Sequence, residues 1–132
     1  MTVSVIDREL LANLIDLMEG DRDLVIEVMD LFLEDAPQRI EAIVSAVDGG
    51  DPDELMRAAH SLKGSAGNVG ARGLSGLCAN LEQRGRNGSV AGTQMICMAL
   101  HREFAAVRAA LVAERDRLRG ESDTGGPTVI AV

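Results

Sequence analysis

The chain has 132 residues, of which 46% are hydrophobic and only 2% aromatic, so the expectation is a single domain with an aliphatic core. This composition suits packed helices better than a β-sandwich. The formal net charge of −8 argues against nucleic acid, which attracts clustered Lys and Arg, and against adsorption to anionic membranes. No basic segment followed by a long apolar one opens the sequence, so we expect neither signal peptide nor membrane span and a cytoplasmic location.

Capping residues and apolar spacing predict five helices with short connections. Asp7 caps a first short helix over about residues 8–18, and Asp21 caps a second over about 22–48. Pro37 falls within the second helix, but the apolar stripe keeps its phase across the proline. The sequence therefore favours a kink at Pro37 over a break.

The third helix opens in the order of a capping box, with Asp51 at the cap, Pro52 at the first helical position and Glu54 at the third. Its apolar residues follow at alternating spacings of four and three: Leu55, Ala59, Leu62, Ala66 and Val69. This spacing places one continuous apolar stripe on a helix that faces a core.

Two further helices are predicted over about 72–86 and about 90–119. The end of the last one carries three cations suited to a helix C-terminus: Arg115, Arg117 and Arg119. Residues 1–119 are expected to form one domain and residues 120–132 a flexible C-terminal tail. The predicted fold class is all-α, an antiparallel up-and-down four-helix bundle with an additional short N-terminal helix.

Neither the cysteines nor the second histidine predicts a metal site. Cys78 and Cys97 lie within apolar helical patterns and are expected to be small core residues rather than a disulfide framework. His101 follows Cys97 by four residues, which is half of a zinc-binding set, but no second pair has suitable spacing. We therefore expect the chain to hold no metal and no cofactor.

The most informative segment surrounds His60, on the third helix. His60 lies about 100° round the helix from the stripe residue Ala59. This position is at the flank of the apolar stripe, where a side chain is partly packed against its neighbours and partly exposed. A neutral imidazole there can act as a nucleophile, Lys63 can offset the charge of a phosphoryl group, and Gly64 leaves room for a partner's backbone. A glycine in mid-helix lowers helix stability by about 1 kcal/mol relative to alanine, so a functional role for Gly64 is favoured over an incidental glycine.

This pattern resembles the signature of the histidine-containing phosphotransfer (HPt) domain. The matching residues are His60, Lys63 and Gly64 on one helix, Gly70 at its end, and the run from Cys78 to Glu82 on the next helix. The resemblance extends from about Asp7 to Arg119. In many relatives a Glu or Gln 22 residues after the histidine accepts a hydrogen bond from the imidazole nitrogen that does not attack, and here that position is Glu82.

The resemblance implies a histidine phosphotransfer protein of a bacterial two-component phosphorelay. His60 would accept a phosphoryl group from a receiver-domain aspartate and pass it to another response regulator, with a hybrid sensor histidine kinase upstream. The Mg²⁺ for these reactions is held by the receiver domain in this family. The chain is too short for a catalytic ATP-binding domain, so it is expected to be a phosphocarrier without kinase activity. Because the bundle can bury its own apolar stripes, we expect a monomer.

A partner is expected to dock on the His60 face of the third and fourth helices, together with the second. The predicted docking residues are Met56, Arg57, Gly64, Ser65, Gly67 and Asn68. Four of them have a plainer interpretation. Ser65 can bond back to a carbonyl, Asn68 can end the helix, Arg57 can be surface charge, and Gly64 can be an incidental helix glycine. Likewise Lys63 can be a solvated cation and Glu82 an exposed helix acid.

Two other functions remain open from the sequence. One is a helical adaptor that binds a receiver or kinase domain without taking phosphate. The other is a detached substrate domain of a chemotaxis-type histidine kinase, in which ATP bound by a kinase is the donor. The donor that phosphorylates the chain would distinguish them.

Overall fold

The computed structural model describes residues 6–123, which form five helices and no strand. In chain order the helices are α1 (Arg8–Leu17), α2 (Arg22–Asp48), α3 (Pro52–Asn68), α4 (Arg72–Arg86) and α5 (Gln94–Asp123). The predicted all-α class is confirmed. None of the described helices is both long and apolar enough to cross a membrane.

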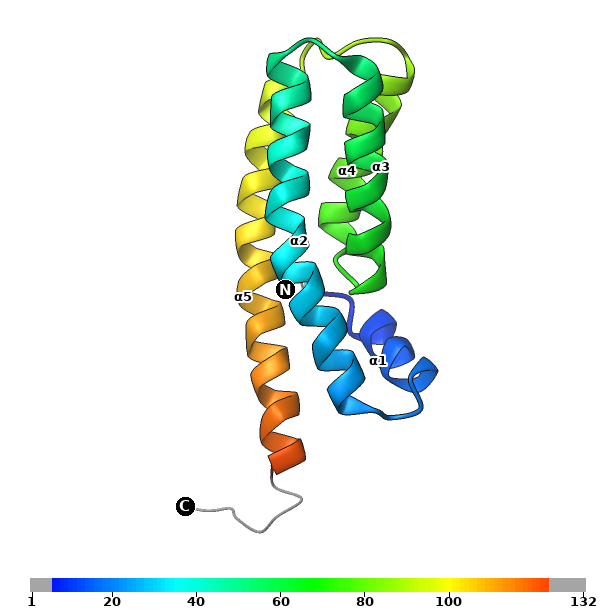
Figure 1. Ribbon diagram of the computed structural model, residues 1–132, viewed down its shortest axis with the longest axis vertical. Helices are drawn as coiled ribbons and strands as arrows, with labels where there is room; N and C mark the ends of the chain where they lie inside the picture. The colour runs from blue at the N-terminus through cyan, green and yellow to red at the C-terminus, as the bar shows by residue number, and fades with distance from the viewer. Residues whose placement is uncertain (1–5, 124–132) are drawn as a thin grey trace, which may run out of the picture.

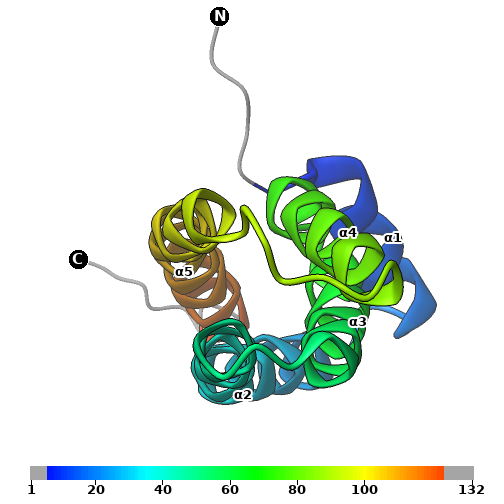
Figure 2. The same cartoon turned by 90° about the horizontal axis from the view of Figure 1, so that it is seen from above.

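The four longer helices lie side by side, as the two views show (Figures 1 and 2). α2 packs against α3 and α5, α4 packs against the same two helices, and α3 with α4 is the most extensive pair. α1 lies at the end of the molecule where α2 begins (Figure 1). The α3–α4 pair therefore presents one broad outer face, and this face carries the candidate site.

The core is aliphatic, as the composition predicts. Its largest side chains with almost no exposed surface come from α2, α3, α4 and α5: Val25, Met29, Ile43, Leu55, Leu62, Leu74, Leu81, Leu100, Val107, Leu111 and Leu118. The Phe32 and Phe104 rings meet between α2 and α5, with centroids 6.2 Å apart. Cys78 and Cys97 are buried with free thiols, so the prediction that both are core residues is confirmed.

The helix starts follow the predicted caps. The Asp21 carboxylate accepts a hydrogen bond from the Leu24 amide at 3.0 Å, and that of Asp51 accepts one from the Glu54 amide at 3.1 Å. The Asp51 amide itself donates to the Ala46 carbonyl at 2.9 Å, so only one half of the predicted capping box forms. α2 continues through Pro37 from Arg22 to Asp48, and the expectation that no break occurs there is confirmed.

The predicted bounds of the last helix are wrong at both ends. α5 begins at Gln94 rather than near residue 90, because the preceding segment turns through Gly92 at φ 72°. It continues to Asp123, so residues 120–123 are helical and not part of a tail. Residues 124–132, including the apolar 128–132, lie outside the described residues.

The cations near the end of α5 are consequently not in its last turn, contrary to the prediction. Arg115 and Arg119 bond the two carboxylate oxygens of Asp30 on α2, at 2.9 and 3.2 Å. Arg117 bonds Glu114 on its own helix at 2.5 Å. Two of these arginines therefore tie α5 to α2 through side-chain ion pairs instead of complementing a helix dipole.

The C-terminal half of α4 approaches α3 closely at Gly85. A Cβ atom at this position would lie 2.6 Å from the Pro52 carbonyl oxygen and 2.8 Å from the Met56 amide nitrogen. Both are backbone atoms, so neither can move aside without shifting a helix. Gly76 on the same helix has no atom within 4 Å of such a Cβ.

We predict that Gly85→Ala destabilises the fold by about 1–3 kcal/mol, because the methyl group forces α3 and α4 apart. The matched variant Gly76→Ala should stabilise by about 0.5–1 kcal/mol, because it removes a flexible residue from mid-helix at no steric cost. Urea unfolding monitored by circular dichroism measures both. Equal stability of the two variants would contradict the close α3–α4 approach.

Candidate functional site

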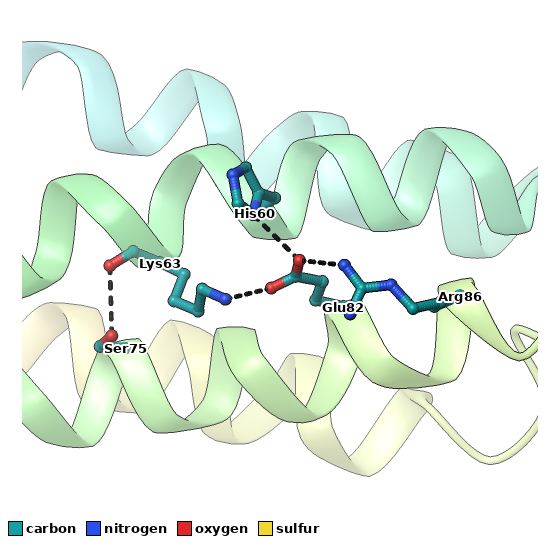
Figure 3. Close-up of polar contacts among 5 residues, drawn as sticks. All are labelled: His60, Lys63, Ser75, Glu82 and Arg86. Atoms are coloured by element: carbon teal, nitrogen blue, oxygen red, sulfur yellow. Dashed lines mark hydrogen bonds and ion pairs between the residues drawn. The ribbon is translucent and has the colours of Figure 1, made fainter.

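His60 lies in the middle of α3 with its side chain 67% exposed. Its chain neighbour Ala59 and the next stripe residue, Leu62, have no exposed surface. The predicted position at the flank of the apolar stripe is therefore confirmed. The Nδ1 atom of His60 lies 2.9 Å from Oε2 of Glu82, which comes from α4 (Figure 3).

Glu82 is the centre of the polar cluster. Its side chain is only 5% exposed, so the interpretation as an exposed helix acid is wrong. Lys63 donates to Oε1 at 2.5 Å, and Arg86 donates to Oε2 at 2.9 Å (Figure 3). The structure thus brings together His60, Lys63 and Glu82, all singled out from the sequence, and adds Arg86.

The surroundings of Glu82 lower the pKa of its carboxyl group. The hydrogen bond from Lys63 is the main cause, burial opposes it, and the contact with His60 lowers the pKa further. Glu82 is therefore ionised at neutral pH and can only accept hydrogen bonds. A neutral His60 must then carry its proton on Nδ1, which leaves the lone pair on Nε2, at the other edge of an exposed ring.

The charges of the cluster favour an incoming anion. With a neutral imidazole, the two cations Lys63 and Arg86 and the single carboxylate of Glu82 leave a net charge of +1. The chain as a whole carries −8. A local positive charge beside an exposed lone pair is suited to an anionic electrophile such as a phosphoryl group.

Sequence analysis missed two residues of this site. Arg86 follows Glu82 by four residues on α4, and that spacing is a signal for an ion pair on one helix face. Ser75 donates its hydroxyl to the Lys63 carbonyl at 3.1 Å and so connects α4 to α3 (Figure 3). No sequence pattern points to Ser75, because the bond joins residues on two different helices.

The buried thiol of Cys78 adjoins this cluster without taking part in it. Burial and the negative charge of Glu82 raise the pKa of Cys78 to about 12, although Lys63 partly opposes this. The thiol is therefore neutral at physiological pH and is a poor nucleophile. Cys78 therefore does not compete with His60 as the candidate nucleophile of the site.

The predicted docking residues separate into three groups. Met56 and Arg57 line a hollow of about 400 Å³ with four other residues: His60, Ser61, Glu82 and Arg86. Ser65 and Asn68 line another, of about 300 Å³, with five residues: Val28, Leu31, Phe32, Asp35 and Val69. Ser65 also bonds back to the Ser61 carbonyl at 3.2 Å, as its plainer interpretation predicts.

The two glycines of the docking set are both exposed. A Cβ atom on Gly64 would have no atom within 4 Å, and one on Gly67 would make only an ordinary contact, 3.9 Å from the Ser75 hydroxyl. Packing within the chain therefore does not require glycine at position 64. No contact among the described residues explains a glycine there.

Among residues 6–123 no group of three or more His, Cys, Asp or Glu side chains could hold a metal ion. His101 is exposed on α5, whereas Cys97 is buried. The chemistry of the site is therefore that of an exposed imidazole, oriented by a buried carboxylate and flanked by cations.

Comparisons with known proteins agree with this chemistry. The sequence model of the Hpt domain matches residues 27–110. Histidine-containing phosphotransfer protein 2 of Arabidopsis thaliana is 34% identical over 68 residues, which are 49% of this chain and 44% of that protein. The match thus spans less than half the length of this curated relative.

Solved structures match over a larger share. Histidine-containing phosphotransfer protein B from Pseudomonas aeruginosa PAO1 has a TM-score of 0.80 and 34% identity, covering 88% of this chain and 98% of that one. A histidine-containing phosphotransfer protein from maize has a TM-score of 0.72 and 27% identity, covering 87% and 89%. Fold and site define a helical protein with a carboxylate-oriented surface histidine. The chain belongs to the Hpt domain family.

We predict that Lys63→Met raises the pKa of Glu82, because Lys63 is the main cause of its lowered value. A carboxyl group with a lowered pKa stabilises the fold above its ordinary pKa, and this contribution is lost as the pH falls through the lowered value. In the variant, this contribution should be smaller, and its loss should be complete at a higher pH.

Carbon-13 NMR of the glutamate side chains, recorded against pH, measures the change. Arg57→Gln is the matched control, because Arg57 pairs with Glu54 at 3.2 Å and not with Glu82. An unchanged titration of Glu82 in Lys63→Met would show that another group keeps it ionised.

Proposed function

We propose that this chain is a histidine phosphocarrier of a bacterial two-component phosphorelay. His60 accepts a phosphoryl group from the aspartate of a receiver domain and passes it to another response regulator. The observation that carries the proposal is the contact of His60 Nδ1 with Glu82 at 2.9 Å, on a ring that is otherwise exposed. It fixes the proton on one nitrogen and directs the other towards a partner.

The bonds that change in the transfer step belong only to His60 and the partner's phosphoaspartate. The Nε2 lone pair of His60 forms a bond to phosphorus while the bond between phosphorus and the aspartate oxygen breaks. The electron pair of that bond returns to the aspartate carboxylate, and the Nδ1 proton stays on the ring. The reverse sequence delivers the phosphoryl group to the next aspartate, and both steps depend on positioning and electrostatics.

The role of each site residue follows from its contacts. Glu82 orients the imidazole, and Lys63, whose side chain is 35% exposed, offsets the charge of the phosphoryl oxygens. The chain holds no metal or cofactor for this step, and the Mg²⁺ is held by the receiver domain. The chain is a cytoplasmic phosphocarrier and has no ATP-dependent kinase activity of its own.

The receiver docks across the outer face of α2, α3 and α4. Met56 and Arg57 meet it in the hollow beside His60, Ser65 and Asn68 meet it in the hollow against α2, and Gly64 and Gly67 leave room for its backbone. The chain acts as a monomer. The packing of α2 on α3 and α5, and of α4 on the same pair, supports an antiparallel up-and-down four-helix bundle to which α1 is an addition.

We expect His60→Gln to abolish phosphorylation without changing helical content, because glutamine is similar in polarity but has no nucleophilic nitrogen. Intact mass at neutral to alkaline pH, after exposure to purified receiver domains phosphorylated with acetyl phosphate, measures the gain of one phosphoryl group. His101→Gln is the matched control and should be labelled like the wild type. Labelling of the His60 variant would contradict the proposal.

The same measurement separates the other functions. A gain of phosphate only from a kinase core with ATP would favour a detached substrate domain of a chemotaxis-type histidine kinase. Binding of receivers with no gain from either donor would favour an adaptor.

A second expectation concerns the exposed Gly64. Gly64→Gln should slow transfer from a receiver by at least about tenfold, because its side chain occupies the space into which the partner's backbone fits, and each lost 1.4 kcal/mol is tenfold. Phosphotransfer assays quenched at a series of times measure the rate. Ala105→Gln, at an exposed position of α5, is the control. Wild-type transfer by Gly64→Gln would refute the steric role of this glycine.

A further inference from the structure

The three partners of Glu82 are divided between its two oxygens. Lys63 alone contacts Oε1, at 2.5 Å. His60 Nδ1 and Arg86 Nη2 share Oε2, each at 2.9 Å (Figure 3). The cation that holds Oε1 can therefore leave without disturbing the oxygen that orients the imidazole.

In the proposed transfer, Lys63 interacts with a second anion, the phosphoryl group, as well as with Glu82. A phosphoryl group on Nε2 lies on the edge of the ring opposite Nδ1, and thus away from Glu82. Lys63 carries its ammonium group on a flexible four-carbon stem with its side chain 35% exposed. When the ammonium group turns towards the phosphoryl oxygens, its hold on Oε1 weakens.

A buried carboxylate that keeps no cation in contact with it is no longer stabilised in its ionised form. Burial alone favours the protonated form of Glu82, whose side chain is 5% exposed, and Lys63 is the main reason that its pKa is lowered. A protonated Glu82 would be a weaker acceptor for the Nδ1 proton of His60. The ring would then lose its orientation at the moment of transfer, unless a second cation remained in place.

Arg86 meets the requirements for that second cation. Its guanidinium group stays charged at any physiological pH. It follows Glu82 by one turn of α4, so the helix places the two side chains on one face at contact spacing, and that spacing does not depend on the position of Lys63. Arg86 also bonds the oxygen that orients the ring, Oε2.

We propose that Arg86 is a positioning residue that keeps Glu82 ionised and on His60 Nδ1 while Lys63 turns to the phosphoryl group. This inference rests on the proposed function. In the resting protein both cations contact Glu82, whereas during transfer Arg86 neutralises Glu82 and Lys63 neutralises part of the phosphoryl charge. Arg86 acts through Glu82 and does not contact the transferred group.

The first test is the transfer rate of Arg86→Gln from a saturating concentration of receiver domain phosphorylated with acetyl phosphate. The rate should fall about tenfold, the effect of one lost hydrogen bond to a charged group. The receiver concentration at half-maximal rate should stay unchanged. Arg86→Lys should recover most of the rate. Arg84→Gln is the matched control on α4, because Arg84 bonds Asn80 and the Ala91 carbonyl rather than Glu82.

A double-mutant cycle with Glu82→Gln separates this role from a direct one. Glutamine can accept the Nδ1 proton but carries no charge that needs a counter-ion. In the Glu82→Gln background, Arg86→Gln should therefore slow transfer less than about twofold. An equal slowing in both backgrounds would show that Arg86 acts on the phosphoryl group or the receiver directly, and would overturn the inference.

The remaining outcomes distinguish this inference from the proposed function. Transfer to Arg86→Gln at the wild-type rate, with the wild type labelled normally, overturns the inference alone. Absence of label on the wild type and on Arg84→Gln, from every receiver domain tried, overturns the proposed function and this inference with it.

Discussion

The site depends on one buried carboxylate. Glu82 lies between α3 and α4 with its side chain 5% exposed, and three nitrogens from His60, Lys63 and Arg86 surround it. Burial of such a charge is unfavourable unless it is paired and hydrogen-bonded. Because cations contact both oxygens of Glu82, the carboxylate stays ionised. A neutral imidazole beside it then has only one tautomer, Nδ1–H, that can donate to it. In the proposed transfer, this arrangement directs the free nitrogen of the exposed histidine towards a partner.

The packing of α3 on α4 makes this arrangement possible. Gly85 allows the two backbones to approach at one end of the contact, where a methyl group would meet the Pro52 carbonyl oxygen at 2.6 Å. Nearer the other end, the Ser75 hydroxyl holds the Lys63 carbonyl at 3.1 Å. Between these points the two helices are close enough for Glu82 of one to reach His60 of the other. The packing of α3 on α4 thus sets the distance between the two helices, and the polar cluster of His60, Lys63 and Glu82 spans that distance.

Much of this could be predicted from the sequence because helices are local structures. The caps at Asp21 and Asp51 predicted the starts of α2 and α3, and the apolar spacing predicted α4 over about residues 72–86. Helix phase placed His60 at the flank of the stripe. The role of Glu82 came from the family resemblance, and its burial could not be read from a single helix. The bounds of α5 and the roles of its arginines differ from the prediction. The segment before α5 turns through Gly92, and Arg115 and Arg119 pair across helices with Asp30, which no local pattern reveals.

The central claim is that Glu82 fixes the proton of His60 on Nδ1, and long-range ¹H–¹⁵N NMR of the two histidine rings tests it most directly. At a pH where both imidazole rings are neutral, the account predicts that His60 gives the spectrum of the Nδ1–H tautomer. His101, which is exposed on α5, should show the mixture of tautomers of a solvated ring. A spectrum in which His60 carries its proton on Nε2, or matches the mixture at His101, would contradict the account.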